Sequence, residues 1–270
     1  MVFDLTYKLE SKQTESSNIE TDKSIKEEII HKPEKILNII QSLSEGNAKA
    51  NLEYSQNAPE LQSLAKYKIS RAMAVLNKKT HFNGLEISIL SKLFITLSGD
   101  SKNNLLSNTD FQTFLQATLG ITDSLALNGI TRAAKKNPSQ RGIRLLEFII
   151  IMNILLRGTV EEKSWLSFKI LDYDNDGLIR KNLEITNFIK NSFELSIASM
   201  NVEVDPEEPE RDTSDYIWKR FESDNMSINY PCFKKAILKE PLLLESLNKF
   251  LPNDSRSIAF QTLLFSQTKL

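Results

Sequence analysis

From Ala58 onward, apolar residues recur at intervals of three and four, which is the period of a helix that buries one face. No stretch shows the strict alternation of a half-buried strand. The pattern predicts helices within 59–82, 84–99, 109–120, 122–134, 145–156, 159–171, 181–193, 216–221, 231–238, 241–251 and 257–265. We therefore expect an all-α protein whose helices, about ten to fifteen residues long, come in pairs.

The same pattern predicts which side chains are buried. In the helix expected at 84–99, one face carries Leu85, Ile87, Leu90, Leu93 and Phe94. The most apolar stretch, Leu145 to Leu156, is too short to span a bilayer and is interrupted by Glu147 and Asn153, so it predicts a buried core helix. After Pro252, a last amphipathic piece offers a packing surface made of Ile258, Leu263, Leu264 and Phe265.

Two segments depart from this helical pattern. Residues 1–56 are polar and charged, and they contain too few apolar residues to offset the entropy lost on folding, so we expect a largely disordered extension. Within it, one short amphipathic helix is expected at Pro33–Gly46, with a shared apolar face of Ile36, Ile39, Ile40 and Leu43. It is either a docking segment or a loosely packed local helix. The acidic, proline-containing stretch from Val202 to Asp215 predicts a loop or linker.

Composition excludes several functional classes. The 270 residues include 34 Lys and Arg against 35 Asp and Glu, a net charge of −1, so we expect neither nucleic acid nor a membrane surface as a partner. The start of the chain lacks the features of a secretory signal, and the single cysteine, Cys232, allows no intramolecular disulfide, so a soluble intracellular protein is expected. No nucleotide-binding, hydrolase or metalloprotease motif occurs, and Cys232 is predicted to be a core residue, so we expect no enzyme.

The segment from Phe168 to Ile185 contains the opening of a calcium-binding EF-hand loop, with ligands at Asp172, Asp174 and Asp176. Gly177 stands where the loop needs a residue without Cβ, the carbonyl of Leu178 follows, and Ile179 is the apolar residue that pairs with a partner loop. At position 12 a bidentate glutamate is expected, but Leu183 stands there and Glu184 comes one residue late. Arg180 occupies position 9. The site at 172–183 is therefore predicted to bind one calcium ion weakly, with Glu184 as a ligand only if the exiting helix is distorted, and a change of Leu183 to Glu is expected to strengthen it.

Three further loops complete two pairs of helix-loop-helix units. The loop from Lys136 to Glu147 keeps its closing acid, but Lys136, Pro138 and Gln140 replace the three oxygen ligands. Loops near 97–111 and 221–233 lack the turn glycine or the closing acid. The chain is thus divided into an N-terminal extension at 1–56, a first EF-hand pair with degenerate loops at 57–158, a second pair with the calcium-like loop at 159–252, and a C-terminal tail at 253–270.

The stretches "HFNGLEISILSKLF", "LGITDSLALNGITRAA", "LLEFIIIMNILLRGTVEEKSWLSFKILDYDNDGLI" and "LKEPLLLESLNKFLP" resemble the calaxin family, within the neuronal-calcium-sensor and calcineurin-B-like group of EF-hand proteins. The resemblance runs from about Leu61 to about Phe265 and excludes the N-terminal extension. It implies a location on the axoneme of motile cilia or flagella, with outer-arm dynein heavy chain, docking-complex coiled-coil proteins and the doublet microtubule as partners. It also implies that Asp172, Asp174, Asp176 and Leu178 match the family's third-hand ligands.

Two kinds of binding protein remain open. One is a constitutive axonemal subunit that anchors or regulates dynein with a weak or absent calcium response, and whose groove grips a helix or coiled coil without needing the ion. The other is a calcium sensor or calcineurin-B-like regulatory subunit that binds an amphipathic helix of a target protein. In either case a groove between helices is expected, with walls that include Ile149, Ile150, Ile151, Ile154 and Leu155.

Overall fold

The structure, a computed structural model, describes residues 34, 36, 38–41, 75–99, 105–137, 139–190, 205, 207–221, 227–246 and 248–265. Within these residues the regular structure is almost entirely helical, and each strand is only two or three residues long. The predicted all-α fold of paired EF-hand units is confirmed.

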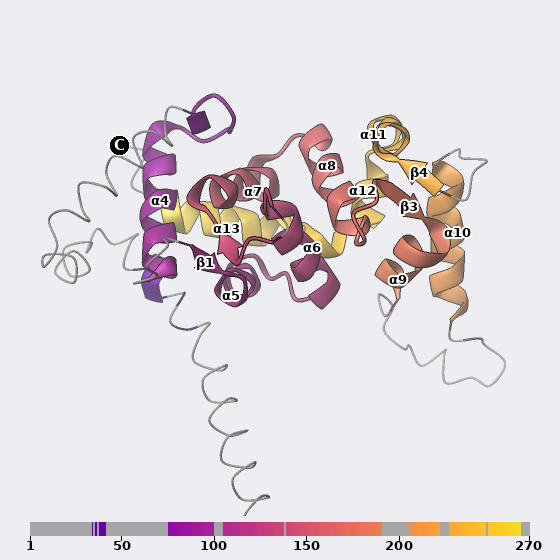
Figure 1. Cartoon of the computed structure of the whole chain (residues 1–270), viewed down its shortest axis with the longest axis horizontal. Coiled ribbons are helices and arrows are strands. Elements are labelled where there is room, and N and C mark those ends of the chain that lie inside the picture. Colours follow the sequence, from indigo (N-terminus) through magenta and orange to yellow (C-terminus); the bar gives the residue numbers. More distant parts are fainter. Residues whose placement is uncertain are drawn as a thin grey trace, which may run out of the picture.

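The two pairs follow one another along the chain (Figure 1). The first pair consists of α4 (Gly84–Ser98), β1 (Leu106–Ser107), α5 (Asn108–Leu119), α6 (Ser124–Ala134), β2 (Gly142–Ile143) and α7 (Leu145–Arg157). The second pair consists of α8 (Val160–Leu171), β3 (Leu178–Arg180), the π-helix η2 (Lys181–Ile185), α9 (Thr186–Ile189), α10 (Glu208–Arg220), β4 (Ser227–Asn229) and α11 (Tyr230–Lys239). The chain then continues through α12 (Leu242–Ser246), the 3-10 helix η4 (Asn248–Phe250) and α13 (Asp254–Phe265).

Each pair is joined by a short antiparallel sheet between its two loops. In the first pair Leu106 lies opposite Ile143, and in the second Ile179 lies opposite Ile228. All four of these apolar residues are buried. The sheet register therefore fixes position 8 of every loop, and all other loop positions can be counted from it.

The helix starts were predictable because polar residues cap them. A side-chain oxygen accepts a backbone N–H of the first turn at Asn83, Ser107, Asp123, Thr159 and Asn229. At Asn83 and Thr159 a glutamate three residues later accepts the N–H of the cap residue in return, which completes a capping box.

Aromatic rings form two clusters within the largely aliphatic core. Phe148 of α7 lies against Phe94, Phe111 and Phe114 of the first pair, with ring centroids 5.5, 6.1 and 5.6 Å away. In the second pair, Phe233 lies 5.6 Å from Phe168 and 5.3 Å from Phe221. The predicted core helix at Leu145–Leu156 is accordingly buried. Among the described residues, no helix combines the length and the apolar character that crossing a membrane would require.

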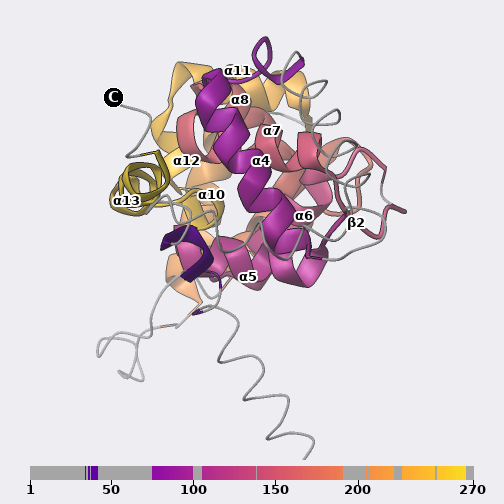
Figure 2. The ribbon, with the colours of Figure 1, turned by 90° about the vertical axis from the view of Figure 1, so that its left-hand side faces the viewer.

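α13 returns from the second pair to the first and packs against α4 and α5 (Figure 1). Figure 2 shows it end-on beside α4. Its buried face consists of Ser257, Phe260, Leu264 and Phe265. The predicted amphipathic tail is thus a helix of the fold, although Ile258 and Leu263, which we expected on its packing face, are exposed.

Only a small part of the N-terminal extension is described. Glu34, Ile36 and residues 38–41 are helical, and Ile36 and Ile40 are buried in the common core. This burial favours the docking segment over the loosely packed helix. Leu43, the predicted disorder of the rest of 1–56, and most of the helix expected at 59–82 lie outside the described residues.

Three further predictions are wrong. The predicted linker at Val202–Asp215 is helical from Glu208, because Pro209 stands in the first turn, where its missing N–H costs nothing, and acidic side chains suit a helix N-terminus. Leu85 was expected on the buried face of its helix, but it is 65% exposed. Cys232 is exposed, since Phe233, Ala236 and Ile237 form the buried face of α11 instead.

Candidate metal centre in the third loop

The candidate metal centre is the loop between α8 and α9. The carboxylates of Asp172, Asp174 and Asp176 each place one oxygen within 4.8 Å of the others. Asp172 is fully buried at the C-terminal end of α8, and the other two are exposed. Gly177 has the left-handed φ of 84° that the turn at position 6 demands. Leu178 opens β3 beside this cluster.

Backbone N–H groups of the loop hold these carboxylates in place. Asp174 Oδ1 accepts the N–H of Asp176 at 3.2 Å, Asp172 Oδ2 accepts the N–H of Gly177 at 3.2 Å, and Asp176 Oδ1 accepts the N–H of Leu178 at 2.8 Å. The aspartates are therefore preorganised by the loop itself.

The closing position is filled by Glu184, not by Leu183. The exiting helix begins with the π-helical turn Lys181–Ile185, which holds one residue more than an α-helical turn would. As a result Glu184 is 3% exposed and its Oε2 accepts the N–H of Arg180 at 2.8 Å, whereas Leu183 is 45% exposed. We expected Glu184 to be a ligand only if the exiting helix were distorted, and the π-turn is such a distortion.

The four loops of the chain explain this π-turn. In three loops, the first core-facing residues of the exiting helix stand five, eight and nine residues after the buried residue at position 8. They are Phe111, Phe114 and Leu115 after Leu106; Phe148, Ile151 and Met152 after Ile143; and Phe233, Ala236 and Ile237 after Ile228. In the third loop the corresponding residues, Ile185, Phe188 and Ile189, stand six, nine and ten residues after Ile179. This loop thus contains one inserted residue, and the π-turn accommodates it while the core contacts are kept. The apolar spacing was the sequence signal that could have placed Glu184.

Two buried oxygens in this loop point to a cation. Asp172 Oδ1 and Glu184 Oε1 are buried, and neither has a hydrogen-bond donor within the described part of the chain. Burial raises the pKa of the Asp172 carboxyl, and the charges of Asp176 and Asp174 raise it further. The charge of Lys169 and the hydrogen bond from the Gly177 N–H lower this pKa, but they do not outweigh the burial. Burial also raises the pKa of Glu184. Since unpaired buried acceptors are costly, carboxylate oxygens from Asp172, Asp174, Asp176 and Glu184 fit a hard cation such as calcium.

The first pair supports this loop directly. The guanidinium of Arg132, on α6, donates to the carbonyls of Lys169 and Ile170 at 3.0 and 2.9 Å, at the C-terminal end of α8. α6 lies so close to α8 that a Cβ on Gly129 would be 2.6 Å from a side-chain carbon of Ile170. We did not predict Arg132 as a supporting residue, because no loop motif includes it.

The second loop is closed by a side-chain amide. Gln140 Nε2 donates to the carbonyl of Gly142 at 2.5 Å and to Glu147 Oε2 at 2.6 Å. These acceptors stand at positions 7 and 12, which both contact the ion in a working EF-hand. Glu147 also accepts the N–H groups of Lys136 and Arg144 at 3.0 and 2.9 Å. The amide of Gln140 thus lies between two groups that would otherwise contact calcium. Loops 1 and 4 fall partly outside the described residues, at 100–104 and 222–226.

The side chains expected to line a groove beside α7 lie inside the fold. Of the predicted wall residues, Ile149, Ile151, Ile154 and Leu155 are buried and Ile150 is partly buried. α13 packs on the first pair at α5 and just before α4: Phe260 lies on Phe114 with a centroid distance of 5.9 Å, and Phe265 lies on Phe82 at 5.8 Å.

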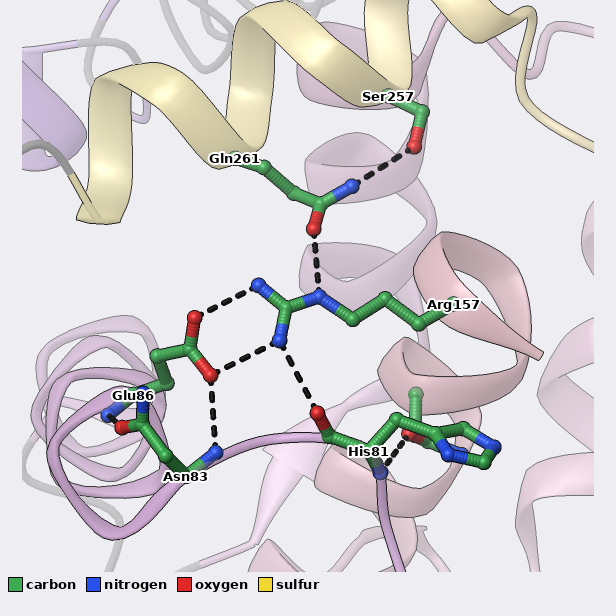
Figure 3. A network of polar contacts seen from close by, with 7 residues as sticks. His81, Asn83, Glu86, Arg157, Ser257 and Gln261 are labelled. Atoms are coloured by element: carbon green, nitrogen blue, oxygen red, sulfur yellow. Dashed lines mark hydrogen bonds and ion pairs between the residues drawn. The ribbon is translucent and has the colours of Figure 1, made fainter.

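Arg157, the last residue of α7, donates hydrogen bonds to both α13 and α4 (Figure 3). Its guanidinium donates to Glu86 Oε1 at 2.6 Å and Oε2 at 2.9 Å, and its Nε donates to Gln261 Oε1 at 2.7 Å. It also donates to the carbonyl of His81 at 3.1 Å and lies over the rings of Phe82 and Phe265. One side chain of α7 therefore joins α13 to α4.

Comparison with known proteins gives a consistent result. The chain is 30% identical to human calaxin over 190 residues, which are 68% of this chain and 87% of calaxin, and 30% identical to calaxin of Xenopus laevis over 193 residues, 69% and 89%. It is also 25% identical to "Calcium-binding protein NCSA" of Dictyostelium discoideum over 121 residues, 45% of this chain and 62% of that protein. No family model matches the chain.

Proposed function

Because this chain belongs to the calaxin family of EF-hand proteins, we propose that it is a non-catalytic subunit of the ciliary axoneme. In this proposal it helps to anchor or regulate outer-arm dynein on the doublet microtubule through the coiled-coil proteins of the docking complex. The observation that carries the proposal is the extent of the similarity, which covers 87% of human calaxin and so is not limited to a single loop.

The calcium response that we propose is weak and limited to the third loop. Within the described residues only this loop brings together three acidic side chains that could hold a metal ion. Asp172, Asp174, Asp176, Glu184 and the carbonyl of Leu178 are the proposed ligands. The second loop needs no ion, because Gln140 already joins the acceptors at positions 7 and 12.

The packing of α13 limits how a partner can bind. A target helix could reach the side of the first pair that α13 covers only by displacing Phe260 and Phe265, which are buried against Phe114 and Phe82. A constitutive subunit needs no such opening. We therefore propose that dynein and the docking-complex proteins contact the outer surfaces of the chain, which calcium does not have to expose.

The alternative is a calcium-regulated subunit of the neuronal-calcium-sensor kind. The similarity to "Calcium-binding protein NCSA" and the preorganised aspartates of the third loop favour it. In that case α13 would leave the first pair in the presence of calcium and a target helix would replace it.

Cross-linking with mass spectrometry on axonemes isolated from motile cilia separates the two functions. The native chain is compared with Asp172→Asn, which keeps the shape of the buried side chain but removes its charge, each with calcium and with a chelator. For an anchoring subunit, both chains form the same cross-links to dynein or docking-complex proteins in both conditions. If the links disappear with the chelator and in Asp172→Asn, the sensor alternative is supported. Absence from axonemes, or no link to these components, overturns the proposed function.

A further inference from the structure

Arg180 places a positive charge inside the candidate metal centre. It stands at position 9 of the loop and ends β3. Its guanidinium donates to Asp176 Oδ2 at 2.5 Å and lies 3.6 Å from Asp174 Oδ2 and 3.9 Å from Glu184 Oε1. One side chain thus reaches three of the four proposed acidic ligands.

The proposed acidic ligands differ in whether their oxygens already accept hydrogen bonds. Both oxygens of Asp176 are engaged, Oδ1 by the N–H of Leu178 and Oδ2 by Arg180. Asp172 Oδ1 and Glu184 Oε1, in contrast, have no donor among the described residues, since 3.9 Å is beyond hydrogen-bond distance for the Arg180 guanidinium. Arg180 must therefore release Asp176 before Oδ2 of that residue can ligate a metal ion.

The main chain and the side chain of Arg180 act in opposite ways. Its backbone N–H orients Glu184 by binding Oε2, which prepares the closing ligand. Its guanidinium neutralises part of the acidic cluster and would lie within a few ångströms of a bound divalent ion, where like charges repel. Substitution of the side chain removes the second effect and leaves the first.

We propose that Arg180 is an internal counter-ion that competes with calcium for the third loop and lowers its calcium affinity. This inference rests on the calcium binding proposed for that loop. In the absence of calcium the guanidinium stabilises the closely spaced carboxylates, so the loop keeps its shape without the ion. Calcium binding then requires the guanidinium to leave the cluster, which moves the response of the loop to higher calcium concentrations.

Lys181 provides a matched control. It is the next residue along the chain and carries the same charge, but its ammonium group pairs with Asp215 of α10 at 2.5 Å. Lys181→Ala therefore removes the same net charge without uncovering a proposed ligand. Arg180→Lys keeps the charge at the site and tests whether charge is the property that competes.

The test is calorimetric titration of the full chain with calcium chloride. Arg180→Ala is expected to bind calcium at least about tenfold more tightly than the native chain, whereas Lys181→Ala and Arg180→Lys stay within about threefold of it. The inference is overturned if Arg180→Ala binds no more tightly than Lys181→Ala, or if Arg180→Lys binds as tightly as Arg180→Ala. Asp172→Asn is expected to abolish the heat of binding in every background. If neither the native chain nor Arg180→Ala binds calcium, the calcium part of the proposed function fails as well, so the two failures are distinguishable.

Discussion

Replacing Arg157 with methionine tests how strongly α13 is held on the first pair. Methionine keeps an unbranched apolar side chain against Phe82 and Phe265. It removes the guanidinium, and with it the two hydrogen bonds to the Glu86 carboxylate and the one to Gln261. The Glu86 carboxylate is left with the N–H of Asn83 as its remaining donor among the contacts described above.

The size of the effect follows from the exposure of the pair. Removing one partner of a fully buried ion pair costs about 3–5 kcal/mol, because the other charge stays buried without a partner. Here the side chain of Glu86 is 8% exposed and that of Arg157 is 29% exposed, so solvent screens part of the interaction and about 2 kcal/mol is expected. The lost hydrogen bond to Gln261 adds about 1 kcal/mol. A total of about 3 kcal/mol corresponds to a melting temperature lower by roughly 6–12 °C for a domain of this size.

Urea and thermal denaturation of the full chain measure this loss. Arg220→Met is the control, because Arg220 also has an acidic partner, Glu240 at 3.4 Å, and an aromatic ring beneath it, but its side chain is 44% exposed. It should cost less than about 1 kcal/mol. In a double-mutant cycle, Glu86→Gln and Arg157→Met should show a coupling energy of about 2 kcal/mol. A loss no larger than that of Arg220→Met, or a coupling energy near zero, would refute the reasoning.

The remaining predictions concern pH, the second loop and the closing ligand. Burial alone would raise the pKa of Glu86, but the hydrogen bond from Arg157, the Asn83 N–H and the Arg157 charge outweigh it, so the pKa lies below its ordinary 4.5. The stabilisation by Glu86 is therefore complete above about pH 4.5 and is lost as the pH falls through the lowered pKa, and the difference in unfolding free energy between the native chain and Arg157→Met should narrow in acid. Gln140→Ala should lower the unfolding free energy by about 1–2 kcal/mol, since Glu147 and the Gly142 carbonyl lose a donor. Gln112→Ala, which removes an exposed hydrogen bond to Asn128 and a longer one of 3.3 Å to Thr131, should cost less in the same denaturation assay. In calcium titrations Glu184→Gln should weaken binding. The sequence alone led us to expect that Leu183→Glu would strengthen binding, but residue 183 is exposed after the π-turn, so this change should have little effect, and a large gain would contradict the π-turn.

Most of the fold could be predicted because its determinants are local. The capping residues and the three-to-four spacing of apolar side chains place α4, α5, α6, α7 and α8 within a residue or two of their predicted bounds. The linker predicted at Val202–Asp215 failed because charge and proline content were treated as signs of a loop, although both suit the first turn of a helix. The position of α13 was also beyond local reasoning, since its contacts with α4 and α5 join residues far apart in sequence.

The candidate site was only half predictable, for a different physical reason. A loop motif assigns ligands by counting forward from position 1, which assumes that the exiting helix starts at a fixed distance. The helix is held, however, by its core-facing side chains, because misplacing Ile185, Phe188 and Ile189 would expose three buried residues, at a cost of several kcal/mol. A single π-turn costs less than that, so the core contacts are kept and the closing position moves to Glu184. Counting backward from the buried residues of the exiting helix therefore identifies the closing ligand where counting forward along the loop does not. The same reasoning explains the role of Gln140. Because Ile143 and Phe148 are buried in the core, Glu147 and the Gly142 carbonyl stay close together without an ion. A side-chain amide that donates to both acceptors is then enough to join them.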